Sequence, residues 1–159
     1  MRKGIYIDRA SFFRNNQTMI KFEKLKSDIL LKIPEVSKTL AEDSRVIFGY
    51  LFGGLATGRV SPLSDVDIAV YVRDAGGLAA YKLYLFDKLT DALGTAELDL
   101  VILNTAPVSL AGRILQHKQL LIDKDPFTRH AYESVTRREF FDFRIQEEAF
   151  FARRYGIGR

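Results

Sequence analysis

The stretch from residue 46 to residue 72 restricts the fold more than any other part of the chain, because it joins two apolar segments through a glycine turn. The run Val46–Phe52 is apolar and stops at Gly53 and Gly54. A run of this length that ends in glycine indicates a buried strand whose end turns sharply or lets a ligand approach the backbone. We therefore expect strand, turn, short helix, loop and second strand in this order.

The second strand begins with a pair of acids. In residues 64–72, strand alternation places Asp65, Asp67 and Ala69 on one face and the intervening aliphatic residues on the other. Carboxylates two residues apart on a strand stand roughly 7 Å apart at the backbone, so both can lean onto one cation. Mg²⁺ is favoured, because it binds one or two protein carboxylates together with substrate phosphates.

The glycine turn predicts the complementary half of such a site. Backbone N–H groups at a strand-to-helix junction bind anions, and the helix N-terminus strengthens this attraction. We therefore expect a phosphate chain and a metal ion to be bound side by side, between the turn and the paired acids.

These motifs resemble a known signature. Gly53 and Gly54, followed after ten residues by Asp65-Val66-Asp67, resemble the pattern of the DNA polymerase beta-like nucleotidyltransferases. The form Phe-Gly-Gly-x-Ala-x-Gly-Arg ahead of Ser-Asp-x-Asp is most similar to the minimal nucleotidyltransferase (MNT) subgroup. Many members of that subgroup are MntA-type antitoxins paired with a HEPN-fold ribonuclease toxin. Gly54 departs from the pattern, because the antitoxins usually have serine there.

The resemblance implies a polymerase beta-like fold and a Mg²⁺-dependent nucleotidyltransferase that uses ATP and two Mg²⁺ ions. It further implies an antitoxin that transfers AMP to a tyrosine of a cognate HEPN toxin and inactivates it. The implied catalytic and metal-binding residues are Asp65, Asp67 and Asp99, and the implied nucleotide-binding residues are Gly53, Gly54, Arg59 and Ser64.

Asp99 is a candidate for the third acid because it lies within an aliphatic run, Leu98–Leu103. Burying a carboxylate without a partner costs several kcal/mol. If this strand pairs with the strand of Asp67, both carboxylates reach the same cleft, and the resemblance places a third acid at this position. The alternative is an exposed or capping aspartate on an edge strand.

Composition limits the function classes. A chain of 159 residues with 47% hydrophobic and 28% charged residues fits one globular domain and leaves no room for a separate acceptor-binding domain. Zero cysteines excludes thiolate metal sites and cysteine catalysis. The net charge of +4 suits a phosphate-rich ligand, a nucleic acid or an acidic partner equally. No segment resembles a signal peptide or approaches the ~20 residues of a membrane span, so we expect a cytoplasmic protein.

The remaining pattern predicts an α/β (α+β) fold: a small mixed β-sheet flanked by helices, with a long C-terminal helix. Within one domain, we expect residues 1–45 to form an N-terminal helical segment, residues 46–123 the catalytic core and residues 124–159 the C-terminal helix. The expected elements are helices at 18–31, 34–42, 78–93, 107–116 and 126–155, and strands at 97–103 and 119–123.

The last helix carries more aromatic residues than one core-facing stripe requires. Aromatic and arginine residues are enriched at protein interfaces, so this helix is the candidate docking surface for a HEPN partner in a hetero-oligomer. Stacking on RNA bases is a second interpretation, and completion of the core by all of the aromatics is a third. The aromatics are Phe140, Phe141, Phe143, Phe150, Phe151 and Tyr155.

Two other functions stay open at this stage. A non-catalytic antitoxin could neutralise its partner by contact, since Gly54 lacks the hydroxyl that a serine offers to phosphates. Nucleotidyl transfer to RNA or to a small molecule is the other alternative. His117 and His130 have no metal-ligand spacing and are expected at the surface.

Overall fold

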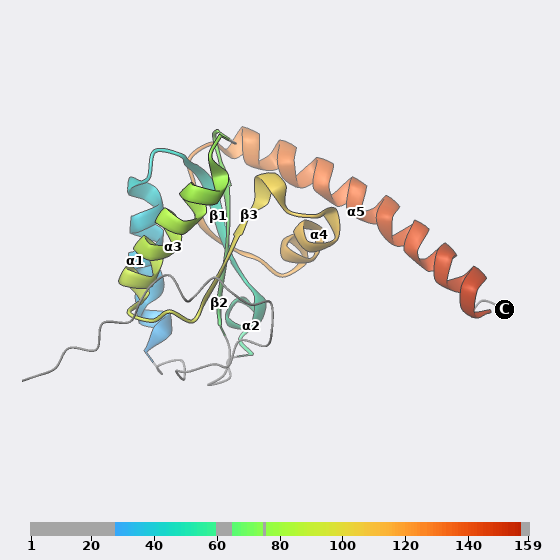
Figure 1. Ribbon diagram of the computed structural model, residues 1–159, viewed down its shortest axis with the longest axis horizontal. Coiled ribbons are helices and arrows are strands. Elements are labelled where there is room, and N and C mark those ends of the chain that lie inside the picture. The colour runs from blue at the N-terminus through green and yellow to red at the C-terminus, as the bar shows by residue number, and fades with distance from the viewer. Residues whose placement is uncertain (1–27, 60–64, 75, 157–159) are drawn as a thin grey trace, which may run out of the picture.

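The computed structural model describes residues 28–59, 65–74 and 76–156. Helices and strands are mixed along the chain, as the sequence predicts (Figure 1). In chain order the elements are α1 (Ile29–Glu42), β1 (Val46–Phe52), α2 (Gly53–Ala56), β2 (Val66–Val72), α3 (Leu78–Leu93), β3 (Leu98–Ile102), the 3-10 helix η2 (Leu103–Thr105), α4 (Val108–Gln116), β4 (Gln119–Asp123) and α5 (Pro126–Tyr155).

The four strands form one mixed sheet in the order β3-β2-β1-β4. β1 is antiparallel to both β2 and β4, whereas β2 and β3 are parallel. The sequence predicted a small mixed sheet, and this prediction is confirmed. β3 and β4 are the two edge strands, so the ends of β1 and β2 lie in the middle of the sheet.

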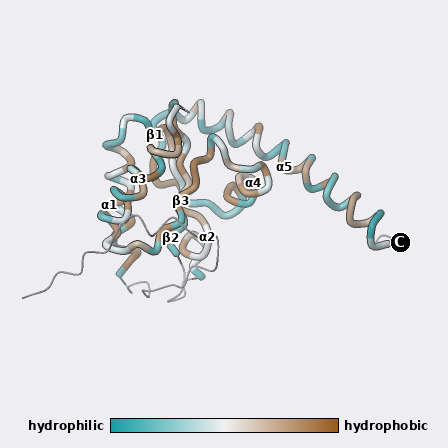
Figure 2. Tube along the Cα trace, in the orientation of Figure 1, coloured by the Kyte–Doolittle hydropathy of each residue, from teal (hydrophilic) through white to brown (hydrophobic). Residues whose placement is uncertain are grey.

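Helices cover both faces of the sheet (Figure 1). α1 and α3 pack on one face, over a core that includes Val66, Ile68 and Val70 of β2. α4 and the first turns of α5 pack on the other face, against Phe48 and Tyr50 of β1. The apolar strands lie between these layers in Figure 2. The alternation predicted for β2 therefore holds, with its aliphatic residues on the α1 and α3 side.

Pro34 does not begin a helix, contrary to expectation. α1 runs without a break from Ile29 to Glu42, with Pro34 inside it. Proline in a helix interior costs about 3 kcal/mol. The apolar stripe of Ile29, Val36 and Leu40 continues across the proline and is buried against the sheet, and this burial offsets the cost. The rest of the helix predicted for residues 18–31 lies outside the described residues.

Most other boundaries follow local signals that the sequence shows. Gly94 ends α3 with a positive φ of 68°, which glycine adopts without strain. At the start of α5, the Asp125 carboxylate accepts a hydrogen bond of 3.1 Å from the Thr128 N–H, and Pro126 occupies the first turn. β1, β4 and α5 have the predicted limits, whereas β3 is one residue shorter at each end.

α5 extends well past the sheet (Figure 1). Its 30 residues correspond to about 45 Å at ~1.5 Å per residue. Every side chain from residue 141 to residue 151 is exposed. Five of the six aromatics of this helix are thus exposed and Phe140 is half-buried, so the alternative in which all six complete the core is wrong. Within the described part of the chain, no helix is long and apolar enough to cross a membrane.

Candidate active site

The turn between β1 and α2 is formed around Gly53. This residue has a φ of 68°, in the left-handed region that L side chains avoid. A Cβ added here would lie 1.9 Å from Oδ2 of Asp67. Glycine is therefore required both by the backbone conformation and by the space that the Asp67 carboxylate occupies. The carboxylate lies directly against the turn.

Asp67 and Asp99 are neighbours on parallel strands. The register pairs Phe52 at the end of β1 with Asp67, and Asp67 with Asp99. Paired residues on adjacent strands lie about 4.8 Å apart at the backbone and present their side chains on the same face. The condition on which Asp99 was a candidate, that its strand lies beside that of Asp67, is therefore met.

The three acids differ in exposure. Asp65 immediately precedes β2 and, like Asp67, is partly buried, whereas Asp99 is exposed. Asp99 combines the two expectations: it lies beside Asp67, and it is an exposed aspartate on an edge strand. The aliphatic neighbours that surround it in the sequence point to the other face, where they are buried: Leu98, Leu100 and Ile102.

Hydrogen bonds within the turn fix the carbonyl groups of α2. The Thr57 hydroxyl donates to the carbonyls of Gly53 and Gly54, each at 3.2 Å. The Arg59 N–H donates to the Gly54 carbonyl at 2.8 Å, and the Arg59 side chain is exposed. Ser64, the other predicted nucleotide-binding residue, lies outside the described residues.

The donor set at this edge of the sheet fits a hard divalent cation. In residues 28–59, 65–74 and 76–156, no three His, Cys, Asp or Glu side chains gather so that they could hold a metal ion. Two adjacent carboxylates are nevertheless a ligand set that Mg²⁺ accepts, with water and phosphate oxygens completing the coordination. The space left by Gly53 keeps the Asp67 carboxylate beside the turn. His117 and His130 are exposed, as expected.

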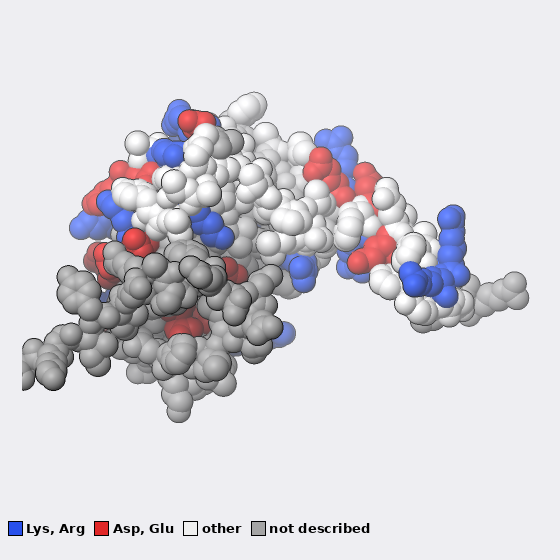
Figure 3. Space-filling model, viewed as in Figure 1, with Lys and Arg blue, Asp and Glu red and all other residues white. Residues whose placement is uncertain are grey.

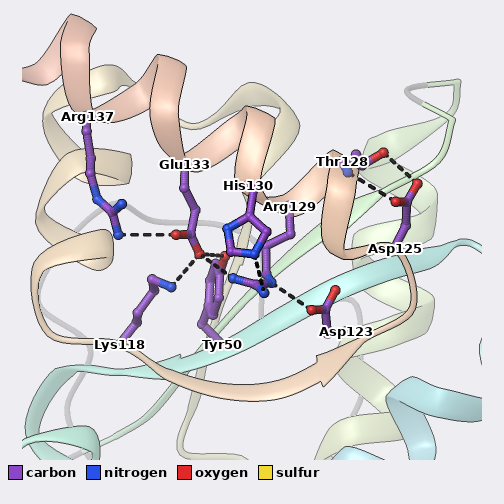
Figure 4. Close-up of polar contacts among 9 residues, drawn as sticks. All are labelled: Tyr50, Lys118, Asp123, Asp125, Thr128, Arg129, His130, Glu133 and Arg137. Atoms are coloured by element: carbon purple, nitrogen blue, oxygen red, sulfur yellow. Dashed lines mark hydrogen bonds and ion pairs between the residues drawn. The ribbon is translucent and has the colours of Figure 1, made fainter.

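One further acid, on the face of the sheet that α4 and α5 cover, was not singled out from the sequence. Glu133 of α5 is buried, at 4% exposure. Its Oε1 accepts hydrogen bonds from the Tyr50 hydroxyl at 2.6 Å, from Lys118 Nζ, and from Arg129 Nη1 at 3.2 Å. Its Oε2 accepts from Arg137 Nη2 at 3.1 Å. Figure 4 shows these groups converging on the carboxylate.

This cluster joins α5 to two strands beneath it, the central strand β1 and the edge strand β4. Tyr50 belongs to β1, Lys118 precedes β4, and Arg129 also donates to Asp123 of β4 at 2.8 Å. The Lys118 ammonium lies 4.3 Å from the centroid of the Tyr50 ring. The i, i+4 spacing of Arg129, Glu133 and Arg137 was the one available signal, but it is equally typical of a solvated helix face.

The surroundings change the pKa values of both groups at the centre. Burial alone raises the pKa of Glu133, but the hydrogen bonds from Lys118 and Tyr50 outweigh it and lower the pKa to about 2. Burial, followed by the hydrogen bond to Glu133, raises the pKa of the Tyr50 phenol. Glu133 is therefore ionised and Tyr50 protonated at neutral pH, which suits a fixed structural contact better than proton transfer.

Several solved structures are similar to the chain. One is described as a toxin-antitoxin with AMP-PNP: its chain is 24% identical, has a TM-score of 0.64, and the alignment covers 75% of this chain and 94% of that one. Another is a tri-AMPylated Shewanella oneidensis HEPN toxin in complex with an MNT antitoxin, with 22% identity, a TM-score of 0.60, and 77% and 95% coverage. A third is the toxin-antitoxin MntA-HepT, with 23% identity, a TM-score of 0.59, and 77% and 95% coverage.

No curated protein matches the chain significantly. The solved structures share the fold at this identity, and their coverage shows that little of their own length lies outside the match. The family described as "Polymerase beta, Nucleotidyltransferase" matches residues 34–127, which include the glycine turn and all three acids. The chain belongs to this nucleotidyltransferase family.

Proposed function

We propose that this protein is an antitoxin that transfers AMP from ATP to a tyrosine hydroxyl of a HEPN ribonuclease toxin and releases pyrophosphate. The observation that supports this most directly is the Asp67 carboxylate, which lies against the Gly53 turn and in register with Asp99. Members of the family transfer nucleotides, and similar structures include a complex with AMP-PNP and an AMPylated HEPN toxin bound to an MNT antitoxin.

Each residue at this edge of the sheet has a distinct role in the proposal. The backbone N–H groups of Gly53 and Gly54 bind the phosphate chain, and the exposed Arg59 guanidinium reaches a phosphate oxygen. Asp65 and Asp67 bind Mg²⁺, which when bound neutralises charge on the nucleotide phosphates. Asp99, the exposed member, shares this metal ion or accepts the proton of the incoming hydroxyl.

The test is to mix the protein with ATP, Mg²⁺ and the purified product of its neighbouring gene, and to weigh that product by intact mass spectrometry. We expect a mass gain of one or more AMP units. Asp67→Asn should lower the initial rate by about 100-fold, because a charge that holds the cation is worth several kcal/mol in the transition state. The matched control is Asp91→Asn, which changes an exposed aspartate of α3 and should leave the rate unchanged.

Two features favour a second candidate function, neutralisation by contact alone. Gly54 offers no hydroxyl to phosphates, and the second half of α5 is exposed along its length. In that case the same experiment gives a tight complex without a mass change, and Asp67→Asn binds the partner as well as the wild type does. A wild-type chain that neither modifies nor binds the product contradicts both functions.

A further inference from the structure

Gln119, the first residue of β4, connects this edge strand to the candidate phosphate turn. Its Nε2 donates a hydrogen bond of 2.8 Å to the carbonyl of Ala56, the last residue of α2, although the two are 63 residues apart in the chain. The backbone of Gln119 pairs with Leu51 of β1, next to the point where the turn begins. The contact therefore reaches α2 from the adjacent strand.

This bond completes the pairing of the α2 carbonyls. Those of Gly53, Gly54 and Leu55 accept hydrogen bonds from N–H groups of residues 57–59, within the same turn. The carbonyl of Ala56 accepts from Gln119 instead. A helix of four residues has little stability of its own, so a bond from a strand of the sheet is an effective way to fix its orientation.

Lys118 fixes the strand end from which Gln119 extends. Its ammonium group donates to the buried Glu133 of α5 and lies over the Tyr50 ring. Consecutive residues of an extended chain point to opposite faces. The Lys118 side chain is thus held under α5, as Figure 4 shows. The Gln119 side chain points the other way and reaches α2.

We propose that Gln119, with its strand end held by Lys118, is a positioning residue that orients the α2 turn for nucleotide binding. The amide donates to Ala56 and has no contact with the nucleotide in this role. Its effect is to keep the N–H groups at the start of α2 in one orientation before ATP arrives, which lowers the cost of binding. The consequence for ATP rests on the proposed function, whereas the orientation of α2 does not.

The test replaces the donor without changing the size of the side chain. In Gln119→Met, amide hydrogen exchange in residues 53–59 should become about five-fold faster, the value for one net hydrogen bond of about 1 kcal/mol. Gln119→Lys restores a donor and should restore slow exchange. The matched control is Gln116→Met, which changes an exposed glutamine of α4 and should leave exchange in α2 as it is in the wild type.

Transfer kinetics then separate positioning from general stability. We expect Gln119→Met to raise the KM for ATP by about five-fold with little change in kcat. The free energy of unfolding should fall by no more than the same factor of about five in the equilibrium constant, or about 1 kcal/mol. Unaltered exchange in residues 53–59, or an equal KM in an active variant, overturns the proposal. If the wild-type chain transfers no AMP at all, the proposed function fails, and the exchange experiment still decides whether Gln119 orients α2.

Discussion

The two halves of α5 contain the same kinds of residue but have different surroundings. Both residues 126–140 and residues 141–155 contain phenylalanine, arginine and acidic residues. In the first half, Glu133 and Thr136 are buried and Tyr132 packs with the aromatic cluster of β1 and β2. In the second half, the aromatics and the charges lie on the surface, where acidic and basic groups alternate (Figure 3).

The difference shows what each half contributes. In the first half Arg129 and Glu133 belong to a cluster of paired, largely buried charges, so removing Glu133 leaves buried charge without its partner. In the second half, three acidic residues and three arginines give no net charge, and an exposed pair such as Arg144 and Glu148 contributes about 0.2–1 kcal/mol. The first half should therefore stabilise the fold, whereas the second half should contribute little to it.

The largest expected effect comes from removing the buried acid. Glu133→Ala should lower the free energy of unfolding by about 3–5 kcal/mol, because Lys118 loses its counter-charge and Arg129 keeps only Asp123 while both remain under α5. Urea denaturation measures the change. Glu147→Ala, at an exposed glutamate of the second half, is the control and should change stability by no more than about 0.5 kcal/mol. Equal losses for the two variants would contradict the comparison.

The same contribution should depend on pH. The pKa of Glu133 is lowered in the folded state from 4.5 to about 2. A depressed pKa means that the stabilisation is complete above the unfolded value and is lost as the pH falls through the folded one. The stability difference between wild type and Glu133→Gln should thus be constant from neutral pH down to about pH 5 and shrink toward about pH 2. A stability difference that stays constant between about pH 5 and about pH 2 would argue against an ionised Glu133.

A smaller effect is expected where the first half ends, at the contact between α4 and Phe140. A Cβ added to Gly112 would lie 2.1 Å from Cγ of Phe140. Overpacking of this kind costs about 1–3 kcal/mol, and the better helix propensity of alanine returns up to about 1 kcal/mol. Gly112→Ala should therefore destabilise by about 1–2 kcal/mol in thermal or urea unfolding. In a Phe140→Ala background, which lacks the Cγ and Cδ2 atoms that the new Cβ would meet, Gly112→Ala should cost less than in the wild type. An equal cost in both backgrounds would place the strain elsewhere.

Sequence patterns were sufficient wherever a local signal marks an element. The apolar runs of β1 and β4 end at glycine or at charged residues, and Asp125 with Pro126 marks the start of α5. The glycine turn and the paired acids were found for the same reason. The prediction that Pro34 begins a helix was wrong. The tendency of proline to end a helix is outweighed by the burial of the apolar stripe of α1 against the sheet and α3.

The remaining features depend on contacts that the sequence does not express. Glu133 looks like any other glutamate of a charged helix, and only the approach of Tyr50 and Lys118 distinguishes it. The contact of Gln119 with Ala56 joins residues far apart in the chain. The aromatics of α5 could be counted from the sequence, but their exposure could not. It follows from the end of α4 at Gln116, beyond which none of the described helices covers α5 (Figure 1).

The smallest effect is expected at Phe141, and it gives the sharpest comparison because the adjacent Phe140 has the same chemistry. Phe141 is 71% exposed, whereas Phe140 is half-buried against Gly112. Phe141→Ser should change the free energy of unfolding by at most about 0.5 kcal/mol, and Phe140→Ser should cost about 2 kcal/mol or more. Denaturation of the two variants under one condition measures both. If Phe141→Ser is as destabilising as Phe140→Ser, the second half of α5 takes part in the fold of the isolated chain. If instead Phe141→Ser is neutral for stability yet weakens binding of the partner protein by ten-fold or about 1.4 kcal/mol, the exposed half of α5 is a surface for association.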